Sequence, residues 1–297
     1  MPGSMIIIGR TGQVARALAV AAQQAGYSLT QIGREALDLE QGERIAPVLE
    51  PVLARSGTNT ILVNAAAYTD VNRAESEAGR AQAVNAVAPG QIAGLCAQAG
   101  IPMIHLSTDY VHDGCLGRAY GEQDVCNPLN VYGRTKLAGE VAVQEAGGAH
   151  LILRTSSVFS ATGRNFLTTI LRLAETQDQL RVVDDQVSCP TSADDIAAAL
   201  VELARRLPAD GASGGALNFC GDTPRSWAGF ASDIIAAFNR ARDRSVVVEP
   251  ILSKDYPSPA ERPACSVLDC RAIREQFGVE QPAYGVAIRK VLSRVLG

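Results

Sequence analysis

The sequence predicts an α/β fold, a Rossmann-like doubly wound parallel sheet with a smaller C-terminal substrate-binding lobe. Three observations carry this prediction. Short β-branched runs alternate with longer helical patterns over residues 5–160, and a glycine loop, GRTGQ, directly follows the first apolar run. The 297 residues are 47% hydrophobic, which is enough to bury a large core. Strand–helix alternation at this spacing is typical of parallel strands joined by right-handed crossovers.

The predicted elements of the first half follow the alternation in order. β-branched runs indicate strands, and apolar residues at helical spacing indicate the segments between them. Gly26 marks the end of the first helix, whereas two prolines weaken the second. The strands are expected at 5–8, 27–32, 60–64, 102–107 and 150–156, with helices at 13–26, 43–56, a long stretch ending at 100, and a segment containing Lys136.

The pattern is less regular after residue 160. Helices are expected at 165–177, 193–206 and 227–242, strands at 180–183, 215–220 and 245–252, and an extended loop at 256–263, where prolines cluster. We therefore expect a dinucleotide-binding Rossmann domain at 5–160. Residues 161–297 are expected to form mostly the lobe that closes over the sheet, with the chain crossing back to the sheet.

Composition excludes several classes of function. The net charge is −4 and no block of like charge stands out, so neither a nucleic-acid partner nor a polybasic membrane anchor is indicated. The apolar runs have strand length, and the apolar start runs directly into the glycine loop rather than forming a signal peptide. Seven scattered cysteines without a CxxC pair, and only three histidines, argue against zinc or disulfides. A cytoplasmic protein is expected.

The glycine loop predicts nucleotide binding. Gly9, Gly12 and Ala15 have the spacing G-x-x-G-x-x-A, which differs from the G-x-G-x-x-G of the usual dinucleotide fingerprint. Both spacings serve the same physical purpose. Glycines let the backbone come close to a pyrophosphate, and the N-terminus of the following helix stabilises the negative charge of that group. A tight strand-to-helix turn without a ligand is the alternative interpretation.

The end of the second strand bears on the choice of cofactor. A carboxylate there would bind the adenosine ribose of NADH, whereas an arginine suits the 2′-phosphate of NADPH. The strand ends in IGRE, with Arg34 at the expected distance. This favours NADPH and leaves NADH as the alternative, since Glu35 is adjacent. A solvated Arg34–Glu35 surface pair is the interpretation without a ligand.

Thr108, Tyr132 and Lys136 are the candidate catalytic residues. Tyr132 and Lys136 share a helix face at i and i+4, so the ammonium is expected to lower the pKa of the phenol toward that of a working general acid. Thr108 follows a strand end, where ligands of parallel sheets collect. The trio suits hydride transfer to a ketone, because the developing alkoxide needs a proton and stabilising dipoles. Taken alone, a Tyr–Lys pair at this spacing is more often an ordinary surface pair.

Seven motifs together resemble the dTDP-4-dehydrorhamnose reductase family, a branch of the extended short-chain dehydrogenases/reductases. The resemblance covers residue 5 to about residue 290. The motifs are GRTGQVA (9–15), VNAAAYTDVNRAE (63–75), LSTDYVHDG (106–114), PLNVYGRTKLAGE (128–140), RTSSVF (154–159), DQVSCPT (185–191) and YPSPAERPACSVL (256–268).

The resemblance implies NADPH-dependent reduction of the C4 ketone of dTDP-4-dehydro-L-rhamnose to dTDP-L-rhamnose. It makes Tyr132 the proton donor, Lys136 the residue that holds the nicotinamide ribose, and Thr108 the residue that orients the keto oxygen. It further implies a cofactor site formed by Gly9, Thr11, Gly12, Gln13, Val14, Arg34, Asp38, Leu39, Ala66, Ala67, Tyr68, Thr69, Tyr132 and Lys136, and a substrate site formed by Thr108, Asp109, Ser157, Asn165 and Arg262.

Departures from the family pattern concern mainly the sugar side. A family tryptophan that resembles a platform for the sugar ring is Ser157 here, and a family glycine is Ser188. His112 replaces a phenylalanine and Asn72 an aspartate. Ala17 lies where some members have an acidic metal ligand, so we predict no metal.

Two alternatives to this function remain open. One is a reductase that makes a related dTDP-6-deoxyhexose such as 6-deoxy-L-talose. The other is a non-catalytic nucleotide-binding regulatory subunit, against which the retained trio argues. A nucleotide-sugar substrate is expected, without nucleic-acid or membrane partners, and a homodimer is compatible with the sequence.

Overall fold

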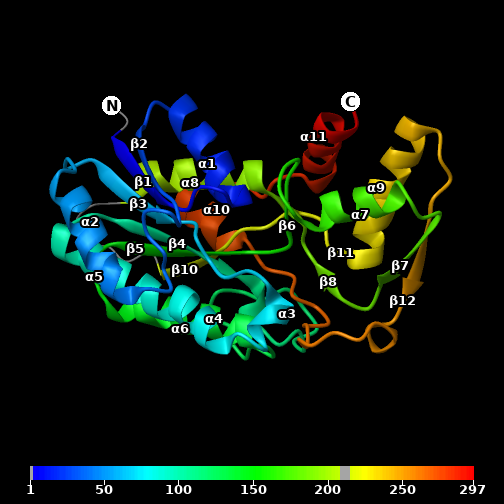
Figure 1. Cartoon of the computed structure of the whole chain (residues 1–297), viewed down its shortest axis with the longest axis horizontal. Coiled ribbons are helices and arrows are strands. Elements are labelled where there is room, and N and C mark those ends of the chain that lie inside the picture. The colour runs from blue at the N-terminus through cyan, green and yellow to red at the C-terminus, as the bar shows by residue number, and fades with distance from the viewer. Residues whose placement is uncertain (1–2, 208–214) are drawn as a thin grey trace.

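The computed structural model describes residues 3–207 and 215–297. Its centre is a parallel sheet of six strands in the order β10-β5-β4-β3-β1-β2 (Figure 1). The strands are β1 (Ser4–Ile8), β2 (Ser28–Ile32), β3 (Thr60–Asn64), β4 (Met103–Thr108), β5 (His150–Thr155) and β10 (Gly215–Asn218). The predicted doubly wound α/β class is confirmed, and each strand predicted before residue 160 forms within two residues of its expected bounds.

The order of the strands creates a crevice beside β1. From β1 the chain moves outward to β2 and then returns to the other side of β1 to form β3. At the carboxyl end of β1, Ile8 lies level with Ile32 on one side and Asn64 on the other. Ligands of open α/β sheets bind at such a reversal, outside the carboxyl ends of the strands.

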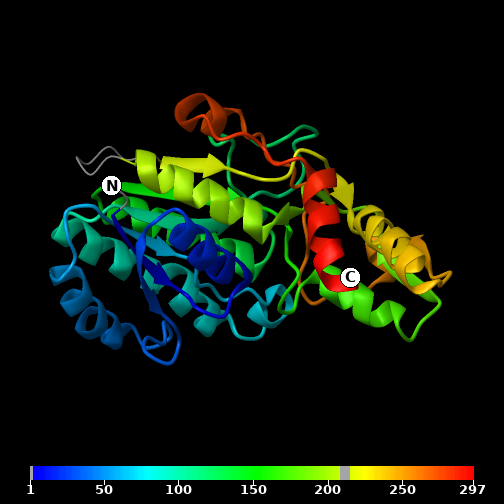
Figure 2. The same ribbon diagram turned by 90° about the horizontal axis from the view of Figure 1, so that it is seen from above.

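Helices cover both faces of the sheet, which is why β3 is buried along its whole length. On one face lie α1 and α8, with α10 beside α8 and β10, and on the other lie α2, α5 and α6 (Figures 1 and 2). These helices are α1 (Gln13–Gln24), α2 (Ile45–Ala54), α5 (Ala88–Ala99), α6 (Val131–Glu145), α8 (Ala193–Arg206) and α10 (Arg271–Phe277). Each face has its own apolar core.

The helical stretches differ in detail from the sequence prediction. Residues 43–56 divide into the short helix η1 (Gly42–Arg44) and α2, and Pro51 is tolerated inside α2. The long stretch before residue 100 contains α3 (Val71–Ala74), α4 (Ala78–Gln82), a π-helical turn η2 (Ala83–Val87) and α5. The π turn places Asn85 in the interior, where its side chain bonds both backbone polar groups of Tyr68.

The second lobe lies beyond the carboxyl ends of the sheet (Figure 1). Its core packs α7, α9 and α11 against the parallel pair β7–β12. The lobe contains α7 (Phe166–Ala174), β7 (Gln179–Val183), α9 (Trp227–Arg242), β12 (Val247–Ile251) and α11 (Tyr284–Leu296), with the short pieces β6 (Val158–Phe159), β8 (Val187–Ser188), β9 (Thr191–Ser192), β11 (Arg225–Ser226) and η4 (Ser253–Asp255). The short helix η3 (Asp109–Val111) directly follows β4 and packs on α6. As predicted, 256–263 forms neither helix nor strand.

The chain returns to the sheet twice after residue 160. First, α8 packs on α1 and β10 pairs with β5; later, α10 packs on α8 and β10. The division into 5–160 and 161–297 stays a proposal, in which α8, β10 and α10 are counted with the sheet. Part of the expected strand 215–220 forms β10, and α10 and α11 had no counterpart among the predicted elements.

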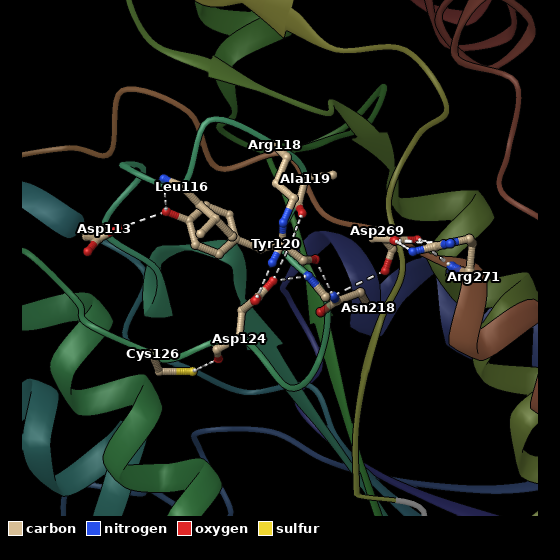
Figure 3. Close-up of polar contacts among 11 residues, drawn as sticks. Asp113, Leu116, Arg118, Ala119, Tyr120, Asp124, Cys126, Asn218, Asp269 and Arg271 are labelled. Carbon is tan, nitrogen blue, oxygen red and sulfur yellow. Dashed lines mark hydrogen bonds and ion pairs between the residues drawn. The ribbon is translucent and has the colours of Figure 1, made fainter.

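The segment between η3 and α6 is fastened to the edge of the sheet (Figure 3). The backbone oxygen of Tyr120 accepts from Asp269 N at 2.8 Å and from Asn218 Nδ2 at 2.9 Å. Arg118 and Asp124 form an ion pair with an Nη1–Oδ2 distance of 2.7 Å. These contacts tie the segment that leads into α6 to β10 and to the end of the 256–268 motif.

His112 lies buried under this segment and stacks on Tyr120, with ring centroids 4.2 Å apart. Neither ring nitrogen makes a hydrogen bond of ordinary geometry within the described residues. Burial, aided by the positive charge of Arg154, lowers the pKa of His112 to about 4, and the nearby backbone of Val125 opposes this weakly. The imidazole is therefore neutral at physiological pH.

Replacing His112 with phenylalanine should increase acid stability. The pKa of His112 in the folded chain lies below its ordinary value of 6.5, so its contribution to stability is complete above pH 6.5 and is lost as the pH falls toward 4. At pH 5 this loss amounts to about 2 kcal/mol. We expect His112→Phe, which keeps a ring against Tyr120, to raise the free energy of unfolding more at pH 5 than at pH 8, measured by urea titration. An equal effect at both pH values would contradict this account.

Candidate active site

A cleft of about 650 Å³ lies at the carboxyl ends of the strands, between the sheet and the second lobe. One wall comes from the glycine loop and the ends of β2 and β3. The floor comes from the end of β4 and the first turns of α6, and the far wall comes from residues 157–165 and Trp227 of the lobe. The cleft therefore occupies the crevice that the order of the strands creates.

The glycine loop has the geometry that a dinucleotide needs. Gly9 adopts a φ of +118°, and a Cβ there would lie 3.3 Å from the Cβ of Ala15, so the small residues keep α1 close to the sheet. Gly12 is the N-cap of α1 and supplies no side-chain hydrogen bond. The amides of the first turn of α1 thus border the cleft without a side-chain cap, as a pyrophosphate site requires.

Two arginines line the wall that the glycine loop and the end of β2 form: Arg10, within the loop, and Arg34, after β2. Arg34 lies 3.9 Å from Asp38 and 3.7 Å from Glu40, measured from guanidinium nitrogen to carboxylate oxygen, and its side chain is 65% exposed. Arg10, which the sequence analysis did not select, pairs with Glu35 at 2.6 Å. Glu35 therefore pairs with Arg10 rather than with Arg34, so the alternative of an Arg34–Glu35 surface pair is not the arrangement in the structure.

Most of the predicted site residues share this one cleft. Those that line it are Gly9, Thr11, Gly12, Gln13, Val14, Arg34, Leu39, Ala66, Ala67, Thr69, Thr108, Asp109, Tyr132, Lys136, Ser157 and Asn165.

Asp38, Tyr68 and Arg262 do not line the cleft. Tyr68 is buried and donates its hydroxyl to Glu77 at 2.9 Å. Arg262 donates to Asn72 Oδ1 at 3.0 Å, and Asp38 accepts from the backbone of Glu40. Their side chains support neighbouring loops, which a motif match does not distinguish from contact with a ligand.

The first turns of α6 lie unusually close to their neighbours. A Cβ on Gly133 would lie 2.2 Å from the backbone oxygen of Tyr110, and one on Gly139 would lie 2.0 Å from that of Asn85. Asn130 caps the helix by accepting from Gly133 N at 2.8 Å and donates to Glu261 O at 2.7 Å. These contacts hold the helix face of Tyr132 and Lys136 against the end of β4.

A buried ion pair anchors the same helix from behind. Arg154 Nη2 lies 2.6 Å from Glu140 Oε2, and Ser107 Oγ donates to Glu140 Oε1 at 2.5 Å. Both charged side chains are at most 5% exposed, so each depends on the other for compensation. Glu140 lies one turn beyond Lys136 and thereby links α6 to the ends of β4 and β5.

Tyr132 is protonated in this structure. Burial raises its pKa to about 12; a hydrogen bond with Thr108 opposes this, and the charge of Asp109 adds to it. The expectation that Lys136 lowers the pKa of Tyr132 is therefore not met, because the cost of burying a phenolate dominates. The ring of Tyr110 meets that of Tyr132 edge-on at a centroid distance of 6.0 Å.

Lys136 is only 2% exposed although it borders the cleft. Its Nζ donates to the backbone oxygen of Leu106 at 2.6 Å and lies 3.3 Å from His105 Nε2. Burial lowers the pKa of Lys136 to about 8, while the negative charge of Glu140 opposes this. The amine and the ammonium are thus both accessible near neutral pH.

The carboxylate of Asp109 accepts hydrogen bonds from three hydroxyl groups of the surrounding loops. Its Oδ2 accepts from Ser156 at 2.8 Å and from Ser266 at 2.5 Å, and its Oδ1 accepts from Thr108 at 3.1 Å. Burial raises its pKa to about 6, and these hydroxyls limit the rise. The family resemblance allows Asp109 either to contact the substrate or to hold the loop in place. These hydrogen bonds favour the second role.

The lobe side of the cleft contains Ser157, Asn165, Arg164 and Trp227. Ser157 has a φ of +43° and lies 2.6 Å, oxygen to oxygen, from Ser188. Asn165 caps α7 through Thr168 N. The ring of Trp227 lies 4.7 Å from that of Phe166, measured between centroids. From the sequence, Trp227 and Tyr256 are the candidates to compensate for the family tryptophan replaced by Ser157, and of these two Trp227 lines the cleft.

The family described as "RmlD substrate binding domain" matches residues 3–296. A dTDP-4-dehydrorhamnose reductase from Sinorhizobium fredii is 40% identical, with 98% of this chain and 97% of the relative covered. The chain belongs to the dTDP-4-dehydrorhamnose reductase family. Another member, from Escherichia coli K12, is 34% identical over 98% of both chains.

Solved structures agree with this assignment. The dTDP-4-dehydrorhamnose reductase from Bacillus anthracis, in complex with NADP, aligns with a TM-score of 0.88 and 26% identity, covering 99% of this chain and 100% of that one. A UDP-glucose 4-epimerase from Brucella ovis, at 18% identity and a TM-score of 0.78, shares the fold over 99% of this chain and 98% of that one.

The described residues contain neither a metal cluster nor a membrane-spanning helix. Within 3–207 and 215–297, no cluster of three or more His, Cys, Asp or Glu side chains is placed to hold a metal ion. Over the same residues, no helix has the length and apolar character needed to cross a membrane.

Proposed function

We propose that this protein reduces the C4 ketone of dTDP-4-dehydro-L-rhamnose with NADPH to give dTDP-L-rhamnose. The observation that carries the proposal is that Thr108, Tyr132 and Lys136 line the same cleft as the glycine loop, whose helix N-terminus has no side-chain cap. A proton donor and a dinucleotide cradle are the two parts that ketone reduction requires.

The reduced nicotinamide, when bound, supplies a hydride to the carbonyl carbon. Tyr132 then gives its phenolic proton to the carbonyl oxygen, and Thr108 orients that oxygen through its hydroxyl. Lys136 stabilises the phenolate that remains and holds the nicotinamide ribose. Because all three groups lie in a cleft partly closed by the lobe, exclusion of water strengthens each of these interactions.

The cofactor assignment is supported by charge and by a relative. The B. anthracis structure contains NADP. In this chain Arg10, in the glycine loop, and Arg34, after β2, line the same wall of the cleft, where a 2′-phosphate would lie, and Arg34 is largely exposed. NADH is the alternative cofactor.

The substrate assignment is supported by the names of the relatives and by the aromatic wall of the lobe. Ser157 and Ser188 replace a family tryptophan and glycine, and this favours a related dTDP-6-deoxyhexose as the second candidate product. Trp227 borders the same cleft, whereas Tyr256 is 58% exposed and does not line it. We therefore assign the role of the missing ring platform to Trp227.

The proton donor and the reaction are tested together. The purified protein should oxidise NADPH only when dTDP-4-dehydro-L-rhamnose is present, and Tyr132→Phe should lower kcat by ~10²–10⁴-fold with little change in NADPH affinity. NMR of the product distinguishes rhamnose from 6-deoxy-L-talose. Absence of turnover in the wild type would favour a regulatory subunit, and unchanged turnover in the variant would refute the role of Tyr132.

Arg34 is expected to distinguish the two cofactors. Arg34→Ala should lower kcat/KM for NADPH by about tenfold or more, and leave the value for NADH nearly unchanged, because only NADPH carries the 2′-phosphate. Arg44→Ala, which removes an exposed cation outside the cleft lining, is the matched control. Equal losses with both cofactors would show that Arg34 does not recognise the phosphate.

Trp227 can be tested by affinity and by fluorescence. Trp227→Ala should raise KM for the nucleotide sugar by about tenfold while the Kd of NADPH stays constant, because stacking area is lost only on the substrate side. Tyr256→Ala is the control outside the cleft. Since Trp227 is the single tryptophan, added dTDP should also change the intrinsic emission of the wild type. Constant emission together with a constant KM would exclude this platform.

A further inference from the structure

Three buried polar side chains form a line from the sheet to the cleft. Asn64 ends β3, His105 is its cross-strand partner on β4, and Lys136 reaches them from α6. Asn64 Nδ2 lies 3.2 Å from His105 Nδ1, and His105 Nε2 lies 3.3 Å from Lys136 Nζ. Asn64 and His105 are fully buried. Water therefore cannot supply a hydrogen bond to any polar atom of these side chains that lacks a partner in the protein.

The orientation of Asn64 is determined by the backbone. Its Oδ1 accepts the amide of Ala66 at 3.2 Å, so its Nδ2 must face the imidazole. The reverse orientation would direct the side-chain NH₂ at a backbone N–H, donor against donor. His105 Nδ1 must therefore accept a hydrogen bond and carries no proton.

The tautomer of His105 follows from this. Burial and the charge of Lys136 hold the pKa of His105 well below its ordinary value, so the imidazole is neutral and has one N–H. With Nδ1 accepting from Asn64, that proton lies on Nε2 and points at Lys136 Nζ. An amine can accept it through its lone pair, whereas an ammonium would oppose it with another N–H.

We propose that His105 is a positioning residue for Lys136: Asn64 holds its imidazole as the Nε2–H tautomer, and this N–H favours the neutral amine of Lys136 over the ammonium. In its amine form Nζ donates one N–H to Leu106 O and accepts from His105. The ammonium form, which the proposed mechanism uses to stabilise the phenolate, keeps the bond to Leu106 O but loses the one from His105, so its pKa is lowered.

Other groups around Lys136 do not supply the same effect. Glu140, on the same helix, favours the ammonium, but its carboxylate is already bonded by Arg154 and Ser107. Tyr132 is protonated and uncharged. Asp109, in the neighbouring turn, is bonded by three hydroxyls. Among the contacts that the structure describes, His105 is the only side chain within hydrogen-bond distance of Lys136 Nζ.

The protonation of Lys136 can be measured directly, because the sequence contains only three lysines. Lys254 and Lys290 are exposed and serve as internal references. Trace acetylation with acetic anhydride across a pH series, with each lysine peptide quantified by mass spectrometry, reports the midpoint at which each amine becomes reactive. We expect the midpoint of Lys136 in the wild type to lie near pH 8, well below those of the references.

Two variants isolate the contribution of His105. In His105→Gln an amide oxygen can face Nζ, and in Asn64→Asp the new carboxylate requires the proton of His105 to lie on Nδ1. Both changes replace an N–H at Lys136 with an acceptor, so both should raise its midpoint, by about 0.5–1 unit or more. Met103→Leu, a buried volume-conserving change on the same strand, should leave the midpoint constant.

The outcomes separate this inference from the proposed function. A wild-type Lys136 midpoint equal to the references, or a midpoint unmoved in whichever of the two variants folds by circular dichroism, would overturn it. The catalytic consequence rests on the proposed function: the alkaline limb of the kcat/KM profile should move up in His105→Gln by the same amount as the midpoint. A purely structural role would lower kcat without moving that limb. The acetylation experiment needs neither sugar nor cofactor. Its result therefore tests the role of His105 even if the proposed substrate is wrong.

Discussion

The close packing of α6 against its neighbours is the constraint on which the site depends. Gly133 and Gly139 let the helix approach backbone oxygens at distances that any side chain would prevent, and the Glu140–Arg154 pair secures it from behind. A shift of this helix by a small fraction of its diameter would separate Tyr132 from Thr108. The position of Tyr132 thus depends on residues that do not themselves line the cleft.

Burial sets the protonation states that the chemistry uses. It keeps Tyr132 protonated, brings the pKa of Lys136 toward neutrality, and keeps His105 neutral. Each shift has the sign expected when a charged form is removed from water. The hydrogen bonds from Asn64 through His105 to Lys136 then determine where the proton of the imidazole lies, because the neutral ring of His105 carries a single N–H on one of its two nitrogens. The protonation state of Lys136 therefore depends on its burial and its hydrogen-bond partners more than on its spacing from Tyr132.

The substrate wall is where this chain differs from its family. A serine in a left-handed conformation stands where the pattern has a tryptophan, and it bonds a second serine that replaces a glycine. On the lobe side of the cleft an aromatic ring comes instead from the start of α9, where Trp227 packs on Phe166. Under the proposed function, a ring on another element changes the direction from which a sugar would be held, while Thr108, Tyr132 and Lys136 still line the cleft.

The sequence by itself determined the sheet, the glycine loop and the Thr108–Tyr132–Lys136 trio, because strand alternation, helix periodicity and motif spacing are local properties of the chain. The tertiary structure alone decided which motif residues reach the cleft. Asp38, Tyr68 and Arg262 lie outside the cleft lining, whereas Arg10 belongs to it. Of the two aromatic candidates Trp227 and Tyr256, only Trp227 lines the cleft, and the pKa of Tyr132 is raised where a lower value was expected. Burial and contacts between distant segments decide these matters, and neither can be read from spacing.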